Sequence, residues 1–572
     1  MSDADKPLIP SLEDMQHWTQ VLGRAQQMML EHSFKTMDGG PPALANLTES
    51  SPFLQAQNAF WNESMALWQR FIVPENAPPL KPEAEKDKRF AAPQWRDNPA
   101  FDLIRQSYLL VSDHMLKGVE NLQGVDEKQH DQLKFATRSF VEAMSPSNFA
   151  LTNPVVLEKT FETKGENLLT GLKHMLADID KGQLTHTDPN AFKVGENIAV
   201  TPGKVIHETP LYQLIQYAPT TETVLKTPLI IFPPWINRFY ILDLNPEKSF
   251  IRWAVEQGLT VFMVSWKSAD ASMADVTWDD YIIKGQIDAI DTVRDLLDVK
   301  AVHTIGYCVA GTTLAATLAL LEARGEAKKV KSATFFTAQV DFTKAGELLT
   351  FIDDNYLSMI DKVVTNGYLD GRYMATTFNL LRGRDLIWNY VTNNYLMGND
   401  YPPFDLLHWN GDTTNLPAKW HRAYLCDLYR DNLLAAGEMV VDGTKIVLST
   451  VKTPSYVQAG REDHIAPPES VWKITEHLSG PLRFVLAGSG HIAGVVNPPS
   501  ANKYQYWRND AAKSLDDYIA GAKETKGSWW PDWIEWIHDQ NNTKVPSTDS
   551  RIPGGGKLKI IEDAPGKYVK TR

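Results

Sequence analysis

Cys308 occupies a position in the sequence that favours chemistry at sulfur. It lies in the run GYCVAG at residues 306–311, after a predicted strand at 302–306 and before a predicted helix at 314–321. The thiolate is the nucleophilic form of cysteine, and the partial positive charge at a helix N-terminus stabilises it. Small residues in such a turn let the strand and helix backbones approach each other around the nucleophile. The pattern predicts a nucleophilic cysteine.

Two polar side chains follow later predicted strands in the order that such a nucleophile requires. Asp463 comes directly after one strand pattern, and His491 comes after the next. Open α/β sheets assemble their active sites at the carboxyl ends of their strands. A histidine can take up the thiol proton, and a carboxylate can orient that histidine. The sequence therefore predicts a triad of Cys308, Asp463 and His491, with Glu462 as the competing acid.

Backbone N–H groups near the turn are expected to form an oxyanion hole. One donor is Val309, the residue after the nucleophile, and the other comes from the run PPWIN at residues 233–237. In that run Ile236 is the first candidate and Trp235 the second.

The sequence also suggests roles for other histidine and cysteine side chains. His464 is expected to be a solvated loop residue, with a secondary substrate contact as the alternative role. His303, inside a strand pattern, and Cys426 are expected to be packed core residues.

The elements that must position these residues alternate after residue 190. Short apolar runs alternate with amphipathic helices, which is typical of a mostly parallel sheet covered on both faces. The expected strands are residues 204–207, 211–217, 229–232, 260–265, 302–306, 333–337, 455–459 and 483–486. Residues 191–572 are therefore predicted to form a doubly wound α/β domain. Its strand, sharp turn and helix around a nucleophile are those of the α/β-hydrolase fold, with cysteine where serine is usual.

The remaining segments suggest a second domain and an insertion. Residues 1–190 are predicted to form a mostly helical N-terminal domain, with 1–10 disordered and 74–93 as a linker rich in proline and charge. Residues 341–445 interrupt the alternation and are crowded with aromatic side chains, so we expect a helical cap over the active site. An ordinary helical insertion is the alternative. The polar, glycine-punctuated tail from residue 547 is expected to be loosely attached.

Composition limits the classes of partner. The 572 residues include 57 Lys and Arg against 70 Asp and Glu, a net charge of −13, which argues against nucleic-acid binding. The two cysteines exclude a disulfide scaffold, and no metal-ligand or dinucleotide motif occurs, so we expect neither a metal nor a cofactor. No apolar run approaches the roughly 18 residues of a membrane-spanning helix. Residues 1–20 are acidic where a signal peptide is basic, which predicts a cytoplasmic protein.

Several longer motifs are spread along the chain. They are QWRDNPAF at 94–101, SPSNF at 145–149, TNP at 152–154, PPWINRFY at 233–240, GYCVAG at 306–311, WNGD at 409–412, GHIAGVVNPP at 490–499 and GSWWPDW at 527–533. Together they resemble the polyhydroxyalkanoate synthases, in particular the class I single-subunit type. One departure is Ala310, where the family usually carries glycine.

The resemblance implies a function and a set of roles. Cys308 would carry the acyl group, His491 would act as general base and Asp463 would be its partner. The substrate would be an (R)-3-hydroxyacyl-CoA, most often short-chain such as 3-hydroxybutyryl-CoA, with CoA released and a polyester chain lengthened. The family also implies a homodimer at the surface of cytoplasmic polymer granules. For the phosphates of the CoA substrate, Arg238 and Lys503 are the nearby basic candidates.

Two other functions fit the same residues. A cysteine-dependent acyl-CoA thioesterase of this fold would release free hydroxy acid. A non-catalytic granule-associated scaffold would keep the fold without the activity, although all three triad positions are filled.

Overall fold

The computed structural model describes residues 59–572, apart from positions 61, 65, 68–86, 123 and 365. The predicted disordered segment 1–10 and most of the predicted linker 74–93 lie outside these residues. The chain divides into two compact units, Met1–Thr137 and Arg138–Arg572. In the described part of the chain, no helix has both the length and the apolar character needed to cross a membrane.

The described part of the first unit is helical, as predicted. It contains α3 (Gln94–Asp97), α4 (Pro99–Glu120) and most of α5 (Glu127–Ala143). Helix α4 begins where Pro99 follows Asn98, whose side-chain oxygen accepts a hydrogen bond from the backbone N–H of Ala100. A proline at the first position and an asparagine cap are both typical of helix starts.

Helices α6 (Pro154–Glu162) and α7 (Glu166–Lys181) belong to the second unit. The side chain of Asn167 donates a hydrogen bond to the carbonyl of Leu396, and the hydroxyl of Tyr395 donates one to Asp178. These contacts join α7 to the insertion, whereas the prediction drew the domain boundary at residue 190. Sequence patterns identify helices but not the partner against which an exposed helix packs.

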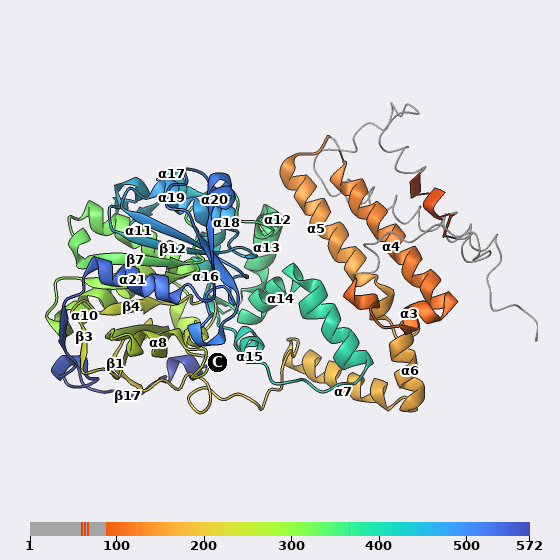
Figure 1. Ribbon diagram of the computed structural model, residues 1–572, viewed down its shortest axis with the longest axis horizontal. Coiled ribbons are helices and arrows are strands. Elements are labelled where there is room, and N and C mark those ends of the chain that lie inside the picture. Colours follow the sequence, from red (N-terminus) through yellow and green to blue (C-terminus); the bar gives the residue numbers. More distant parts are fainter. Residues whose placement is uncertain (1–58, 61, 65, 68–86, 123, 365) are drawn as a thin grey trace, which may run out of the picture. The chain divides into compact units, whose positions relative to one another are not determined.

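An 11-stranded sheet forms the centre of the second unit (Figure 1). Its order is β15-β14-β13-β12-β7-β6-β4-β5-β2-β1-β17, and the six strands from β13 to β5 are parallel. The strands are β1 (Gly203–Glu208), β2 (Tyr212–Tyr217), β4 (Leu229–Phe232), β5 (Val261–Trp266), β6 (Val302–Tyr307), β7 (Val330–Phe336), β12 (Ser455–Gly460), β13 (Leu482–Ala487), β14 (Gln505–Arg508), β15 (Lys523–Lys526) and β17 (Glu562–Asp563). The predicted α/β fold and its eight strands are confirmed.

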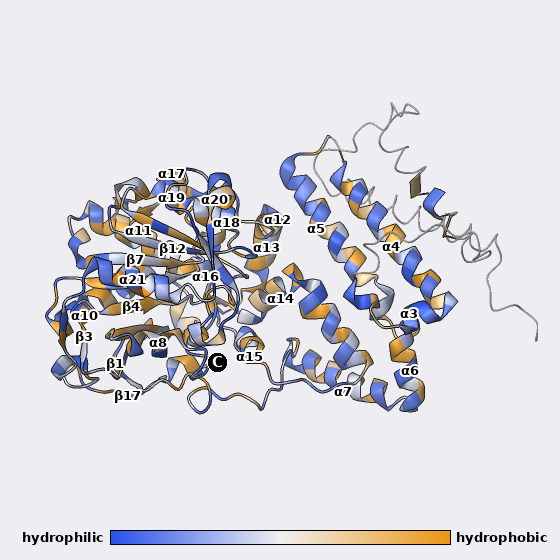
Figure 2. Cartoon of the chain, viewed as in Figure 1, coloured by the Kyte–Doolittle hydropathy of each residue, from blue (hydrophilic) through white to orange (hydrophobic). Residues whose placement is uncertain are grey.

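Helices cover both faces of this sheet. Alternate residues of β4 enter different cores: Ile230 and Phe232 face one, and Leu229 and Ile231 face the other. Helices α10 (Asp288–Leu297) and α11 (Val309–Ala323) pack in the first core, and α8 (Phe250–Glu256) and α21 (Trp530–Gln540) pack in the second. The central strands are apolar because both of their faces are buried, as the hydrophobic colours of the sheet in Figure 2 show.

The insertion follows β7 and returns to the sheet at β12. Its helices are α12 (Leu348–Phe351), α13 (Asp354–Val363), α14 (Gly371–Leu381), α15 (Asp405–Gly411), α16 (Ala418–Ala423) and α17 (Leu433–Ala436), with π-helical segments η10 (Arg384–Trp388), η11 (Val391–Leu396) and η12 (Tyr424–Arg430). Trp420 packs edge-on against Trp235, with ring centroids 5.1 Å apart, and stacks on Tyr424 at 5.0 Å. The aromatic side chains of the insertion thus join the core of the sheet domain.

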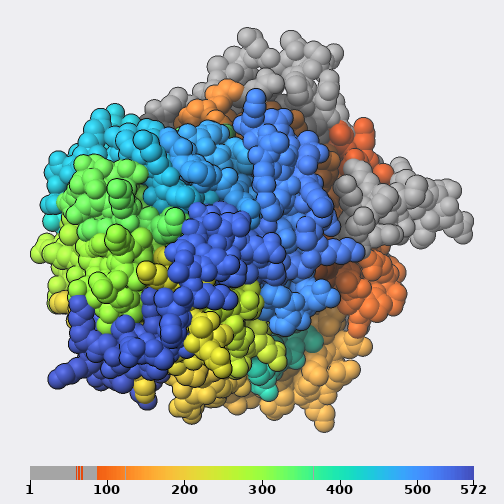
Figure 3. Space-filling view, turned by 60° about the vertical axis from the view of Figure 1, so that its left-hand side comes forward, coloured from red at the N-terminus to blue at the C-terminus, as the bar shows by residue number. Residues whose placement is uncertain are grey.

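The C-terminal tail is firmly attached, so the expectation of a loose extension is wrong. Just before the tail, strand β16 (Lys544–Pro546) pairs with β3 (Thr223–Leu225). Within the tail, Ser547 donates its backbone N–H to the carbonyl of Glu222, and β17 pairs with β1. Arg551 is buried and donates hydrogen bonds to the carbonyls of Leu225 and Lys226. Unpaired edges of strands favour such additions. Figure 3 shows the dark blue tail lying across the surface of this unit.

Candidate active site

Cys308 lies at a sharp turn between β6 and α11, as predicted. Its backbone has φ 53° and ψ −127°, a sparsely populated region for a residue other than glycine. The Cys308 N–H donates to the carbonyl of Phe336 at 2.9 Å, and the Cys308 carbonyl accepts from Gly311 at 2.8 Å and Thr312 at 3.2 Å. These three bonds hold the strained residue at the N-terminus of α11, where its thiol is partly exposed.

Two glycines make this turn possible. A Cβ on Gly306 would lie 2.5 Å from the Cα of Gly311, and a Cβ on Gly311 would collide with the side chain of Ala338. The close approach of strand and helix is therefore made at residues 306 and 311. Ala310 is buried with its methyl group in place, so residue 310 does not have to be glycine in this turn.

His491 and Asp463 lie next to each other at the carboxyl ends of β13 and β12. The Nδ1 atom of His491 is 2.7 Å from Oδ2 of Asp463. The other carboxylate oxygen accepts hydrogen bonds from the N–H groups of Ile465 at 2.8 Å and Ala466 at 2.9 Å. Asp463 is buried whereas Glu462 is exposed. The structure thus pairs His491 with Asp463 and leaves the competing acid in solvent.

His491 interacts electrostatically with the thiol of Cys308. Burial lowers the pKa of His491, but the charges of Asp463 and Cys308, together with hydrogen bonds to both, raise it to about 10. The hydroxyl of Tyr307 also donates to the carbonyl of His491 at 3.0 Å. Such an imidazole keeps its proton at neutral pH, and it forms an ion pair with the sulfur when the thiol is ionised. The three predicted triad residues are therefore brought together.

The other histidines and the second cysteine have different surroundings. His464 is partly buried rather than solvated, and burial is the largest cause of its lowered pKa. Its Nδ1 atom has no hydrogen-bond partner among the described residues. His303 is fully buried, with Nδ1 2.7 Å from the hydroxyl of Ser332, and is a packed core residue as predicted. Cys426 packs at the edge of the first core, also as predicted.

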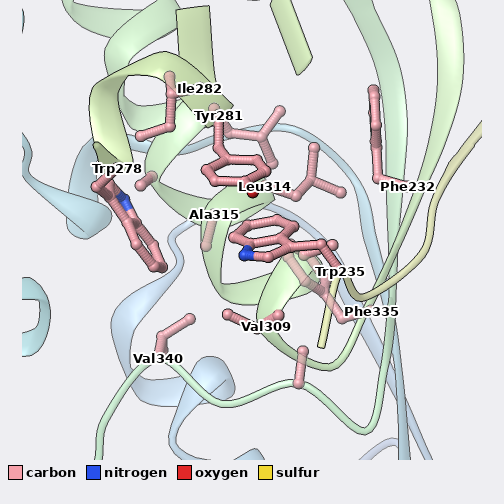
Figure 4. Packing of buried hydrophobic residues seen from close by; sticks show 14 of the residues in the cluster. Phe232, Trp235, Trp278, Tyr281, Ile282, Val309, Leu314, Ala315, Phe335 and Val340 are labelled. Carbon is pink, nitrogen blue, oxygen red and sulfur yellow. The ribbon is translucent and has the colours of Figure 1, made fainter. Parts of the chain in front are cut away.

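The two predicted oxyanion donors have free N–H groups. Within the described residues, neither Val309 nor Ile236 donates its backbone N–H to an acceptor. The alternative, Trp235, has its ring in the core: it stacks on Tyr281 at 3.9 Å (Figure 4). The backbone N–H of Ile236, the residue after this ring, has no acceptor among the described residues.

Arg238 is not available to a phosphate group, because its guanidinium is buried and makes four hydrogen bonds within the protein. It pairs with Asp412 at 2.8 Å and donates to the carbonyls of Thr413, Tyr568 and Thr571. The expectation that it binds CoA phosphates is therefore wrong. Lys503 is exposed. No three His, Cys, Asp or Glu side chains are grouped to hold a metal ion anywhere in the described part of the chain.

Two tyrosines of the insertion interact electrostatically with Cys308 and were not predicted. Burial raises the pKa values of Tyr424 and Tyr429, and the charge of Cys308 raises both further. The side-chain amide of Gln339 lies 3.3 Å from the Tyr429 hydroxyl. Tyr424 and Tyr429 are five residues apart, and residues at this spacing lie on the same side of a π-helix but not of an α-helix. If η12 were an α-helix, the two hydroxyls would therefore point in different directions.

The comparisons with known proteins place these features in a family. Residues 86–254 match the family model described as "Poly-beta-hydroxybutyrate polymerase (PhaC) N-terminus", and residues 228–498 match "alpha/beta hydrolase fold". The chain is 45% identical over 535 residues to a poly(3-hydroxyalkanoate) polymerase subunit PhaC of Rhizobium meliloti (strain 1021), covering 92% of this chain and 87% of the relative.

Two further relatives agree. A poly(3-hydroxyalkanoate) polymerase of Methylorubrum extorquens is 45% identical over 92% of this chain and 88% of its own length. The polymerase subunit PhaC of Cupriavidus necator is 42% identical over 90% of this chain and 88% of its own length. With such identity over nearly its whole length, and with the hydrolase fold described above, the chain belongs to the poly(3-hydroxyalkanoate) polymerase family.

Proposed function

We propose that this protein is an acyltransferase that polymerises (R)-3-hydroxyacyl-CoA into a polyester, with release of CoA, through an acyl-Cys308 intermediate. The observation that carries the proposal is a strained cysteine at a helix N-terminus joined electrostatically to a His491–Asp463 pair. The relatives named as polymerases support polyester synthesis. The family description that names poly-beta-hydroxybutyrate supports a short-chain substrate such as 3-hydroxybutyryl-CoA.

In the first step the Cys308 thiolate attacks the thioester carbonyl of the substrate. The carbonyl oxygen becomes an oxyanion, which the N–H groups of Val309 and Ile236 stabilise. The carbon–sulfur bond to CoA then breaks, and the departing sulfur takes the proton held by His491. One thioester replaces another, so the acyl group stays activated, and His491 is left neutral.

In the second step the 3-hydroxyl of another acyl unit attacks the acyl-cysteine. Neutral His491 takes the hydroxyl proton, the Cys308 thiolate leaves, and an ester bond forms. Both sulfur and imidazole return to their starting states. Asp463 holds the imidazole ring in the orientation that both proton transfers need. With one thiol of this kind per chain, elongation within one subunit is the simplest scheme, and no cofactor besides the CoA of the substrate is needed.

Water competes with the hydroxyl as acceptor, so a polymerase needs a covered site. The insertion supports this requirement because the charge of Cys308 raises the pKa values of Tyr424 and Tyr429, and because Trp420 packs against Trp235. We propose that residues 341–445 form a cap whose movement admits substrate, with His464 as a secondary substrate contact. A homodimer at the surface of cytoplasmic polymer granules is the assembly we expect.

The test measures CoA release and insoluble polymer with hydroxyacyl-CoA substrates of increasing chain length. The wild-type protein should be fastest on the four-carbon substrate, and Cys308→Ala should release no CoA. Cys308→Ser should lose nearly all turnover, because a hydroxyl is a far weaker nucleophile than a thiolate. Turnover close to wild type in Cys308→Ala would refute the acyl-cysteine scheme.

The same experiment separates the two alternatives. A thioesterase would convert the substrate to free hydroxy acid in stoichiometric yield without insoluble polymer. A scaffold would release no CoA even as the wild-type protein, and Cys308→Ala would retain the full cellular phenotype.

A further inference from the structure

Thr414 of the insertion fixes the loop that follows β4. Its hydroxyl oxygen lies 2.7 Å from the carbonyl oxygen of Trp235 and 2.6 Å from that of Ile236. The Thr414 residue is 4% exposed, so water does not replace these contacts. The single proton of this buried hydroxyl, which comes from a distant part of the chain, is shared between two successive carbonyls of the loop.

Because of the geometry of the peptide bond, this contact also fixes the direction of the neighbouring N–H group. A trans peptide is planar, and its C=O and N–H point in opposite directions. The carbonyl of Trp235 and the N–H of Ile236 belong to the same peptide unit. Because Thr414 holds the carbonyl on one side, the N–H of Ile236 is directed to the other side. The carbonyl of Ile236 faces the same hydroxyl, so the N–H of Asn237 also points away from Thr414.

The backbone around Thr414 is itself fixed to the loop. Asn237 and Thr413 form an antiparallel bridge, and the indole of Trp409 donates to the carbonyl of Arg238 at 2.6 Å. The buried Arg238–Asp412 ion pair joins the same two segments. These contacts hold the backbone at Thr414 in place next to the loop after β4.

We propose that Thr414 is a positioning residue for acyl transfer: it aims the free N–H of Ile236 at the oxyanion. The inference rests on the proposed function, because it needs the loop after β4 to supply an oxyanion donor. It adds that the insertion builds part of the oxyanion hole. Loss of an oxyanion donor costs about 10²–10³ in rate, and a donor that is present but loosely held should cost less.

The experiment compares Thr414→Val, which keeps the shape and removes the hydroxyl, with Thr414→Ser, which keeps the hydroxyl. The control is Thr187→Val, since the buried Thr187 hydroxyl also bonds to backbone, at the carbonyl of Pro402 and the N–H of Phe404, outside this loop. For each variant we would measure the single-turnover rate of CoA release from 3-hydroxybutyryl-CoA. The rate of Cys308 alkylation by iodoacetamide would be measured in parallel.

Alkylation measures the reactivity of the Cys308 sulfur and forms no oxyanion. A variant that slows CoA release but not alkylation has therefore lost oxyanion positioning and not the general integrity of the site. We expect Thr414→Val to slow CoA release on the order of 10- to 100-fold while alkylation changes less than about twofold. Thr414→Ser and Thr187→Val should both release CoA within about threefold of wild type.

The inference fails if Thr414→Val releases CoA at the wild-type rate, or if its alkylation falls as much as its CoA release. Either result leaves the proposed function standing as long as Cys308→Ala is inactive. An active Cys308→Ala variant would instead overturn the proposed function, and with it the role of Thr414.

Discussion

At the scale of single residues, the protonation of His491 depends on its two neighbours, the carboxylate of Asp463 and the thiol of Cys308. Its pKa in the folded protein is about 10, above the ordinary value of 6.5 for histidine. A group whose pKa is raised by folding stabilises the folded state while it is protonated. This contribution is complete below pH 6.5 and is lost as the pH rises through about 10.

We therefore expect the difference in melting temperature between wild type and His491→Gln to shrink as the pH rises from 6.5 to 10. Thermal unfolding followed by circular dichroism at several pH values measures it. The comparison with the variant removes the contributions of other titrating groups. A difference that stays constant over this range would contradict the raised pKa.

The partner of His491 can be tested with a neighbouring control. Asp463→Asn removes the carboxylate bound to Nδ1 of His491, and we expect polymerisation to slow by about 10²–10⁴-fold, as in other triads that lose this group. Glu462→Gln changes the adjacent exposed acid and should leave the rate near that of wild type. Equal losses in the two variants would argue against a specific role for Asp463.

At the scale of elements, the turn between β6 and α11 depends on Gly311 more than on Ala310. A methyl group at residue 311 would meet the side chain of Ala338, which belongs to the segment after β7. Overpacking of this kind costs about 1–3 kcal/mol, so Gly311→Ala should lower the free energy of unfolding by at least that much.

Ala310→Gly is the matched control because it removes a methyl group instead of adding one. It should change stability by about 1 kcal/mol or less, the cost of glycine in a helix. Urea denaturation of both variants gives the comparison. A stable Gly311→Ala variant would show that the helix can shift away from the strand.

The elements that could be predicted are those with a local signature. Strands β4 to β7 and β12 to β13 are short, buried runs rich in apolar residues. Order along the chain, placement at strand ends and flanking glycines selected Asp463 and His491. Strand β15 was not predicted because its sequence, Lys523–Lys526, is polar and exposed at the edge of the sheet. Thr414 was not selected either, because its importance comes from a contact with residues 235 and 236, far away in sequence.

At the scale of the whole molecule, the tail is part of the stability of the sheet domain. The guanidinium of Arg551 donates to the carbonyls of Leu225 and Lys226 and to the hydroxyl of Thr260, and burial lowers its pKa to about 10. Arg551→Met would leave these buried acceptors without a donor. We expect a loss of about 2–3 kcal/mol in the free energy of unfolding.

Lys557→Met is the control for that measurement. Lys557 lies in the same tail and pairs with Asp295, but both side chains are largely exposed, and exposed pairs contribute about 0–1 kcal/mol. Chemical denaturation of the two variants distinguishes a tail that anchors the fold from one that only covers it. Equal, small effects would contradict the anchoring role of Arg551.

The hydrogen bonds of Arg238 also impose an order on biosynthesis. Arg238 follows the loop beside Cys308, yet two of the carbonyls that hold its guanidinium belong to Tyr568 and Thr571. A nascent chain that has already made the nucleophile turn still lacks these partners until translation has passed residue 571. We therefore expect the loop after β4 to be fully braced only once residues 568–571 have folded onto it.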